Sequence, residues 1–211
     1  MYNQQPQIVL TPVVKILLII NVALYVLTAF IAPNIGPYLY EYFPTSDNFQ
    51  PYQLLTHMFM HDPHGLGHIA FNMFALVSFG TMVEMVWGPQ RFLFFYLFCG
   101  FGATALDLGV KYWQISSGSL PIEVANQMSS LGASGCMYGV MVAAAMIAPN
   151  IRMGVMFLPF SLEAKYFVPI IVAIDLVLGI SNAHTGVGHF AHVGGAVTGF
   201  LLSYYWLRGF K

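Results

Sequence analysis

The chain has 211 residues, of which 58% are hydrophobic and only 7% are charged, whereas roughly 25% of an ordinary soluble domain is charged. This composition excludes a water-soluble globule and a disordered chain, because so much apolar surface could be neither buried within one small domain nor left in water. The net charge of −1, with no basic tract, argues against a nucleic-acid partner, so we expect a protein of the lipid bilayer.

Six apolar runs follow one another along the chain, and each is a candidate for a membrane-spanning helix of roughly 20 residues. They cover about residues 13–32, 67–87, 92–110, 131–148, 166–180 and 189–207. The first run is too long for a signal peptide and ends in Ala32-Pro33-Asn34 without a small-residue cleavage site, so we expect a retained span. The sequence therefore predicts an all-α membrane protein, a six-transmembrane-helix bundle that forms a single domain over residues 1–211.

The distribution of charge predicts which way this bundle faces. Six spans place both termini on one side of the membrane, together with all cations except Lys111: Lys15, Arg91, Arg152, Lys165, Arg208 and Lys211. Because cytoplasmic loops are enriched in Lys and Arg, we expect both termini in the cytoplasm. The longest connection, Pro33 to Leu66, then lies outside, where its many Pro, Tyr and Phe residues suit the membrane interface.

Polar side chains at membrane depth are costly and mark candidate functional residues. In the second run, His68 and Asn72 are four residues apart and share one helix face. Both can donate hydrogen bonds without carrying charge, which suits the stabilisation of an oxyanion. Hydrogen bonds between helices in lipid would explain the pair equally well.

The fourth run opens with Gly132-Ala133-Ser134-Gly135. The preceding Ser129 and Ser130 are suitable N-caps, which predicts a helix from about Leu131 with Ser134 about one turn inside it. Near a helix N-terminus, unpaired amide groups and the helix dipole favour a developing negative charge. Taken alone, this segment is better interpreted as a packing motif of small residues, built on Gly132, Gly135 and Gly139.

The sixth run carries His192 close to the helix face formed by Gly195 and Gly199, whose spacing lets another backbone come near. His192 lies about as deep in its helix as Ser134 does in the fourth run, so a base and a nucleophile are expected side by side. The alternative is a core histidine bonded to a backbone carbonyl. His189 is expected at the mouth of the same helix, turned away from the glycine face.

Single acidic residues also occur in the apolar runs, namely Glu84, Asp107 and Asp175. Asp175 lies within about two turns of the outer end of the fifth run, where a carboxylate could orient His192. We favour instead a water-exposed acid or one that caps a loop.

In this order, the motifs resemble those of the rhomboid family of intramembrane serine proteases: HxxxN in the second run, GxSG in the fourth and AHxxGxxxG in the sixth. The resemblance covers nearly the whole chain and implies a Ser–His dyad, with Ser134 as nucleophile and His192 as general base. It also implies an oxyanion hole formed by His68, Asn72 and the backbone N–H of Ser134. Structural roles are implied for Gly132, Gly135, Tyr138, Gly195, Gly199, His57, His61 and Glu84.

One position departs from the family pattern. Many members carry Trp-Arg shortly before the Thr-His of the first loop, whereas this chain has Tyr52-Gln53 before Leu54-Leu55-Thr56-His57. We therefore expect the first loop to be anchored differently. No dyad or oxyanion position is lost, which favours an active member.

The resemblance implies a rhomboid-type serine endopeptidase that cleaves transmembrane protein substrates near their outer end through an acyl-enzyme. We expect a multi-pass protein of the bacterial inner (plasma) membrane, with the lipid bilayer and transmembrane substrates as partners. No cofactor and no metal are expected, because the chain has no HExxH motif and its cysteines, Cys99 and Cys136, lie in apolar runs without a CxxC.

Two alternative functions stay open. The first is a rhomboid-like protein that binds membrane helices without cutting them, although intact Ser134 and His192 argue against it. The second is a haem or metal protein with histidine ligands, which could use His57, His61, His64 and His68. Against this second alternative, Pro63, Gly65 and Gly67 interrupt the helix on which such ligands would have to lie. Metal analysis tests this alternative, and labelling of Ser134 by a fluorophosphonate tests the first.

Overall fold

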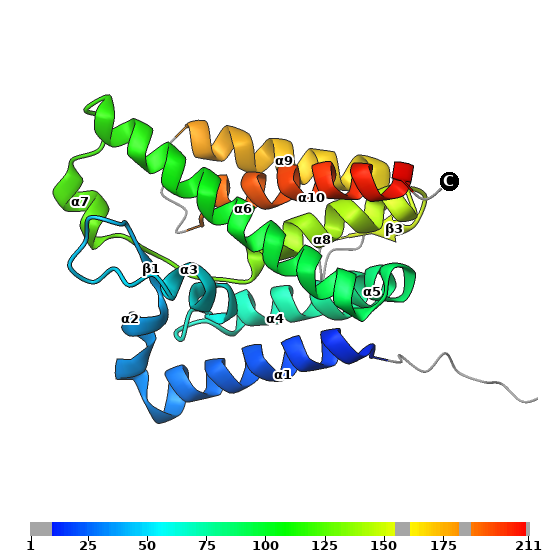
Figure 1. Ribbon diagram of the computed structural model, residues 1–211, viewed down its shortest axis with the longest axis horizontal. Coiled ribbons are helices and arrows are strands. Elements are labelled where there is room, and N and C mark those ends of the chain that lie inside the picture. The colour runs from blue at the N-terminus through cyan, green and yellow to red at the C-terminus, as the bar shows by residue number, and fades with distance from the viewer. Residues whose placement is uncertain (1–9, 155–160, 182–186, 210–211) are drawn as a thin grey trace, which may run out of the picture.

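The computed structural model describes residues 10–154, 161–181 and 187–209, which form a bundle of helices running in alternating directions (Figure 1). In this part of the chain there are six long helical segments. They are α1 (Pro12–Val26) with a π-helical end (Leu27–Ile31), the continuous α4 (Leu66–Ala75), π-helical turn (Leu76–Gly80) and α5 (Thr81–Trp87), then α6 (Pro89–Ser116), α8 (Ser134–Ile147), α9 (Ala164–Ile180) and α10 (His189–Gly209).

Short elements occupy the connections between these helices. The first connection holds two 3₁₀ turns (Pro33–Ile35 and His57–Phe59), α2 (Gly36–Leu39), β1 (Glu41–Tyr42) and α3 (Gln53–Thr56). After α6 come α7 (Ile122–Gln127) and β2 (Ser129–Ser130), and β3 (Arg152–Met153) pairs with β4 (Leu162–Glu163) between α8 and α9.

Three of the described helices are long and apolar enough to cross a membrane, namely Pro12–Ile31, Leu66–Trp87 and Pro89–Ser116. Ser134–Ile147 is a shorter apolar helix. The chain is therefore a mostly helical membrane protein. Each expected apolar run falls on a helix, but α6 continues to Ser116, six residues beyond the expected end at about 110.

The start of α8 corrects the sequence-based expectation of a helix from Leu131. Ser129 and Ser130 are not N-caps, because they form β2, which pairs antiparallel with β1 through Glu41 opposite Ser130 and Tyr42 opposite Ser129. The helix begins at Ser134 itself, with Ala133 at the N-cap position. A pairing with the first connection, distant in sequence, thus holds the chain extended just before the nucleophile candidate.

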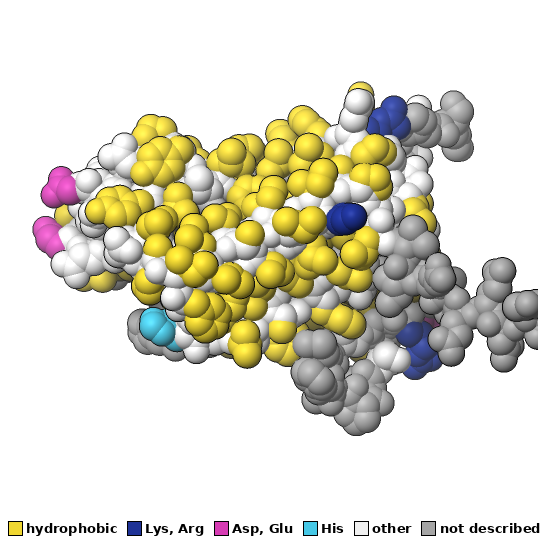
Figure 2. All heavy atoms as spheres, turned by 90° about the horizontal axis from the view of Figure 1, so that it is seen from below, with side chains coloured by type: hydrophobic (Ala, Val, Ile, Leu, Met, Phe, Trp, Pro, Cys, Tyr) yellow, Lys and Arg dark blue, Asp and Glu magenta, His cyan; other side chains and the backbone are white. Residues whose placement is uncertain are grey.

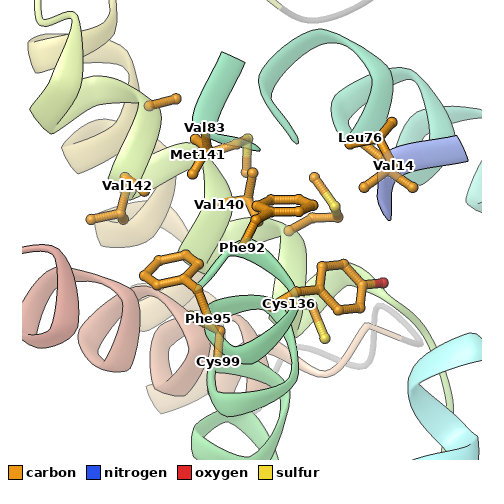
Figure 3. Close-up of a cluster of buried hydrophobic side chains, with 14 of the residues drawn as sticks. Val14, Leu76, Val83, Phe92, Phe95, Cys99, Cys136, Val140, Met141 and Val142 are labelled. Atoms are coloured by element: carbon orange, nitrogen blue, oxygen red, sulfur yellow. The ribbon is translucent and has the colours of Figure 1, made fainter. Parts of the chain in front are cut away.

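A core of apolar side chains fills the space between α1, α4, α6 and α8 (Figure 3). Phe92, Phe95 and Cys99 of α6 lie against Cys136 and Val140 of α8, and all five are fully or almost fully buried. The two cysteines are free thiols. This packing fixes α8 at the centre of the bundle, so its first residue is held by rigid surroundings.

The outer surface is apolar over a broad band, with acidic side chains at one end of the molecule and basic side chains at the other (Figure 2). Large exposed hydrophobic side chains lie on several of the outer helices, among them Ile16, Phe30, Phe94, Val177 and Tyr205. A water-soluble protein rarely exposes so much contiguous apolar surface, whereas a bilayer solvates it.

The first connection is anchored from inside by Gln53. The Gln53 side chain is 1% exposed; its amide group donates to the carbonyl oxygens of Tyr38 and Asn48 at 3.2 and 3.0 Å. Its Oε1 accepts from the backbone N–H of Gln50 at 3.1 Å. Three contacts from one buried amide therefore fold this loop on itself.

Candidate active site

Ser134 is the first residue of α8, and the loop before it adopts a backbone that favours glycine. Gly132 has φ = +133°, a conformation that residues with a side chain rarely adopt. Its N–H donates to the carbonyl oxygen of His57 at 2.9 Å. This glycine is thus held in place from the first connection, and Ser134 follows at the positive end of the helix.

Ser134 lies beside His192, the fourth residue of α10. The Ser134 Oγ and the His192 Nε2 are 2.8 Å apart, a hydrogen-bond length between a hydroxyl and an imidazole. The structure therefore brings together the two residues that the motifs single out as nucleophile and base.

The approach of these two side chains depends on glycines where α8 and α10 cross. A Cβ added to Gly199 would lie 2.5 Å from the Cα and 2.8 Å from the carbonyl oxygen of Gly139. A Cβ added to Gly195 would collide with the backbone of Gly135. The two backbones touch directly, so the distance between the helices is set by main-chain contact.

His68 of α4 reaches the same place from the opposite side. A Cβ added to Gly132 would lie 3.0 Å from the His68 Nε2 and 3.5 Å from the Ser134 Oγ, so both side chains lie against Gly132. The His68 Nδ1 accepts a hydrogen bond from the backbone N–H of Asp62 at 3.3 Å. The proton of a neutral His68 ring therefore lies on Nε2, beside Gly132, where it can be donated.

Asn72 lies one turn further along α4 and is 6% exposed. Its Nδ2 donates to the His68 carbonyl oxygen at 2.8 Å, which orients the amide group along the helix. Because an amide nitrogen has two hydrogens, a second donor is left for a ligand. Asn72 and His68 both line the cavity onto which Ser134 opens.

Asp175 of α9 corrects a second expectation, because it is neither exposed to water nor the cap of a loop. The residue is 6% exposed. Its Oδ1 lies 2.5 Å from the His189 Nδ1 and 3.2 Å from the His192 Nδ1, and its Oδ2 accepts from the hydroxyl of Tyr138. The alternative that the sequence left open, a carboxylate beside His192, is the one that the structure shows, and His189 is a further partner of the same oxygen.

Tyr138 and His189 complete the surroundings of the candidate base. The Tyr138 ring stacks on the His192 ring, with centroids 4.3 Å apart and an angle of 14° between the planes. His189 is the first residue of α10, as expected, and it is buried, with its Nδ1 on the Asp175 Oδ1.

A single cavity of about 1810 Å³ joins these side chains. Ser134, His192, His68 and Asn72 all line it, so an extended peptide segment could reach the nucleophile and the donors at once. Other lining residues are polar in the first connection and the end of α6, namely Glu41, His57 and Lys111, and aromatic or aliphatic in α4 and α9, among them Phe71, Phe74 and Ile171.

Two titratable groups of the first connection, Glu41 and His57, are buried. Burial raises the pKa of the Glu41 carboxyl to about 8, an effect that Lys111 partly opposes. Burial also lowers the pKa of the His57 imidazole to about 4. His57 has a donor and an acceptor nearby: its Nδ1 lies 2.7 Å from the Gln53 carbonyl oxygen and its Nε2 3.2 Å from the Thr104 hydroxyl.

His61 and Glu84 also have partners that suit structural roles. The His61 Nε2 lies 2.9 Å from the Asn21 Oδ1 of α1. The Glu84 carboxylate accepts from the backbone N–H groups of Val13 and Val14 at 2.9 Å and from the Thr11 hydroxyl at 2.6 Å, so it caps the N-terminus of α1.

Within the described residues, one group has ligand atoms close enough for a metal ion: Asp175, His189 and His192, all within 4.8 Å of one another. The four histidines of the alternative metal site, His57, His61, His64 and His68, do not form such a group in this part of the chain. His57, His61 and His68 instead make the hydrogen bonds described above.

Comparison with known proteins finds matches to rhomboid sequences. The family model for the rhomboid domain matches residues 48–209. The chain is 34% identical to the rhomboid protease GluP of Bacillus subtilis over 149 residues, 71% of this chain and 25% of that protein. It is 31% identical to RHOMBOID-like protein 6, mitochondrial, of Arabidopsis thaliana over 155 residues, 74% of this chain and 43% of that protein.

A third relative is the rhomboid protease AarA of Providencia stuartii, 30% identical over 142 residues, or 64% of this chain and 50% of that protein. The chain thus spans a quarter to a half of the length of these relatives.

Proposed function

The chain belongs to the rhomboid family, and from this premise we propose that it is an intramembrane serine endopeptidase that cleaves transmembrane proteins near their outer end. The observation that carries the proposal is the 2.8 Å contact between the Ser134 Oγ and the His192 Nε2. A hydroxyl within hydrogen-bond reach of an imidazole is the arrangement that activates a serine nucleophile.

In the first step, Ser134 attacks a peptide carbonyl of the substrate while the neutral His192 takes the hydroxyl proton on Nε2. The carbonyl oxygen becomes an oxyanion. The donors that we assign to it are the His68 Nε2–H, the Asn72 amide and the N–H of Ser134, all from residues that line the cavity. The N–H of Ser134 has no partner inside α8 because this residue opens the helix. Such preformed donors stabilise the transition state more than the ground state.

In the second step, the protonated His192 gives its proton to the leaving amine, and the acyl-enzyme forms on Ser134. Water then attacks the ester, with His192 again taking the proton, and the free serine is regenerated. The polar side of the cavity, which holds His57 and Lys111, supplies a route for water to a nucleophile inside the bundle.

We place the site near the outer face of the membrane, with six spans and both termini in the cytoplasm. Five cations belong to the end where α1 begins and α10 ends: Lys15, Arg91, Arg152, Lys165 and Arg208. Lys111 belongs to the opposite end, and Lys211 lies outside the described residues. The separation of acidic and basic ends in Figure 2 supports this orientation. A multi-pass protein of the bacterial inner membrane accords with the bacterial relatives.

The substrate class follows from the same geometry. A helix that spans the membrane keeps its carbonyl groups in hydrogen bonds, so it must unwind before Ser134 can reach one. We therefore expect substrates with Gly, Pro or small polar residues near their outer end, and a small residue before the cleaved bond.

The test uses the full chain in liposomes with a single-span substrate that carries a helix-breaking segment near one end. Cleavage by the wild type, its loss in Ser134→Ala and labelling of Ser134 by a fluorophosphonate would support the proposal. EDTA is expected to leave the rate unchanged. A folded protein that binds the substrate without cutting it or being labelled would favour the non-proteolytic alternative.

A further inference from the structure

The carboxylate of Asp175 is surrounded by donors from two other helices. Its Oδ1 faces the Nδ1 atoms of His189 and His192 at 2.5 and 3.2 Å, and its Oδ2 accepts from the Tyr138 hydroxyl. A carboxylate only accepts hydrogen bonds, so each neighbour must donate. The arrangement is satisfied only when both histidines carry a proton on Nδ1.

This requirement decides which nitrogen of His192 is free. A neutral imidazole has one N–H, and with the proton on Nδ1 the Nε2 atom is an acceptor. The Nε2 is the atom that faces the Ser134 hydroxyl at 2.8 Å. Asp175 thus selects the tautomer that can take a proton from the nucleophile, whereas the other tautomer would present an N–H to it.

Asp175 also fixes the plane of the base. The Tyr138 ring stacks on His192 at 4.3 Å, and the Tyr138 hydroxyl is bound by the other oxygen of the same carboxylate. The Asp175 side chain therefore holds the His192 ring through Nδ1, and it also holds the Tyr138 ring on which His192 stacks. When the His192 imidazolium forms, the carboxylate compensates its charge without taking its proton.

We infer that Asp175 is a positioning residue, and that this chain works with a Ser134–His192–Asp175 triad rather than a dyad. Its effect on the reaction rests on the proposed function, but its effect on the tautomer of His192 does not. The two can therefore fail separately.

The first measurement is the protonation of the His192 ring nitrogens by ¹⁵N NMR, on protein labelled at histidine in detergent micelles. The wild type is expected to carry the proton on Nδ1 and to leave Nε2 bare. Finding the proton on Nε2 in the wild type would overturn the inference, and this readout needs neither a variant nor activity.

The second measurement compares Asp175→Asn with Asp107→Asn, the same change at a buried acid of α6 that pairs with Lys111 at 2.7 Å. Asp175→Asn is expected to move the His192 proton towards Nε2, because the amide presents a donor to Nδ1. By comparison with the same change in other serine proteases, kcat is expected to fall by about 10²–10⁴-fold, with KM changed less than about threefold. Asp107→Asn is expected to leave the His192 tautomer unchanged.

Unchanged kcat and an unchanged tautomer in a folded Asp175→Asn protein would overturn the inference. Stoichiometric zinc in the purified wild type, whose removal by EDTA alters the His192 signals, would also overturn it, since an ion would then occupy Nδ1. If the wild type neither cuts substrate nor reacts with a fluorophosphonate, the proposed function fails. The tautomer shift in Asp175→Asn would still decide whether Asp175 positions His192.

Discussion

The backbone N–H of Gly132 donates a hydrogen bond of 2.9 Å to the carbonyl oxygen of His57, which ties the loop before the nucleophile to the end of the first connection. The β1–β2 pairing holds the same loop two residues earlier. The position of Ser134 is therefore determined partly by a segment remote in sequence, and changes in either place are expected to affect catalysis.

Removing the nucleophile is the first prediction. Ser134→Ala deletes one hydroxyl and leaves the glycine contacts of α8 intact, so the midpoint of thermal unfolding should change by only a few degrees. Proteolysis should fall by at least about 10⁴-fold, as it does when other serine proteases lose this group. Cleavage of a transmembrane substrate is measured in liposomes, and turnover at the wild-type rate would refute the serine mechanism.

The second prediction separates the two histidines of α10. His192→Ala should abolish cleavage, because it removes the group that contacts the Ser134 hydroxyl. His189→Ala should keep most activity, within about tenfold, since the His189 Nδ1 meets Asp175 whereas the contact with the Ser134 hydroxyl is made by His192. His189→Asn, whose amide can still donate to Asp175, is the matched control. An active His192→Ala beside an inactive His189→Ala would reverse the assignment.

The third prediction concerns the donors of α4. His68→Ala and Asn72→Ala should each lower kcat by up to about 10²–10³-fold, because each removes one donor from the developing oxyanion. Binding of substrate should change less, so the two constants are measured separately. If both single variants and the double variant kept the wild-type kcat, the oxyanion hole would have to lie elsewhere.

The fourth prediction tests the helix crossing. Gly195→Ala should lower the free energy of unfolding by about 1–3 kcal/mol and reduce activity, because its methyl group would collide with the Gly135 backbone. Gly109→Ala on α6 is the control, since nothing lies within 4 Å of a Cβ there. That change should be neutral or stabilise by up to about 1 kcal/mol. Thermal unfolding of both variants in one detergent checks the contrast; equal destabilisation would count against backbone contact.

The fifth prediction is a pH dependence of stability that involves Glu41. Its pKa rises from 4.5 to about 8 on folding because the carboxyl is buried, so the folded protein keeps a proton that the unfolded chain releases. The free energy of unfolding should therefore fall as the pH rises from about 4.5 to about 8. Glu41→Gln cannot ionise and should lose this part of the slope.

His57 gives the pH dependence of stability the opposite sign, because its pKa falls from 6.5 to about 4 on folding. The stability that its neutral form contributes is therefore lost as the pH falls through this range. The two groups are separated by comparing wild type and Glu41→Gln at pH 5 and pH 8. The difference in free energy of unfolding between Glu41→Gln and the wild type should favour the variant more at pH 8 than at pH 5. An equal difference at both pH values would contradict the buried-proton explanation.

The sequence predicted the helices better than their ends. Each of the six apolar runs falls on a helix, and three of these helices are long and apolar enough to span a bilayer, because long apolar stretches are visible without tertiary information. The start of α8 was wrong because the backbone of Ser129 and Ser130 bonds to β1, a partner that local capping preferences do not include. The motif spacing was informative about Ser134 and His192, since glycine faces permit close helix contact.

The sequence offered Asp175 as a carboxylate that could orient His192 but gave no reason to prefer that role. Helix α9 is apolar on all sides, so no periodicity indicates which face turns towards α10. Whether Asp175 meets water or an imidazole depends on that rotation. The loop anchor Gln53 was likewise visible only as a departure from the family pattern, because its partners are backbone carbonyl groups.

The burial of α8 bears on how the protein tolerates membranes of different thickness. With 14 residues, the helix rises about 21 Å, less than the roughly 30 Å of a hydrocarbon core, and none of its side chains is exposed. Lipid mismatch acts on surfaces in contact with lipid, so thinner or thicker bilayers will tilt outer helices such as α1. Helix α8, which carries Ser134, has no exposed side chain through which such mismatch could act. The distance from Ser134 to His192 should therefore stay constant across lipid compositions.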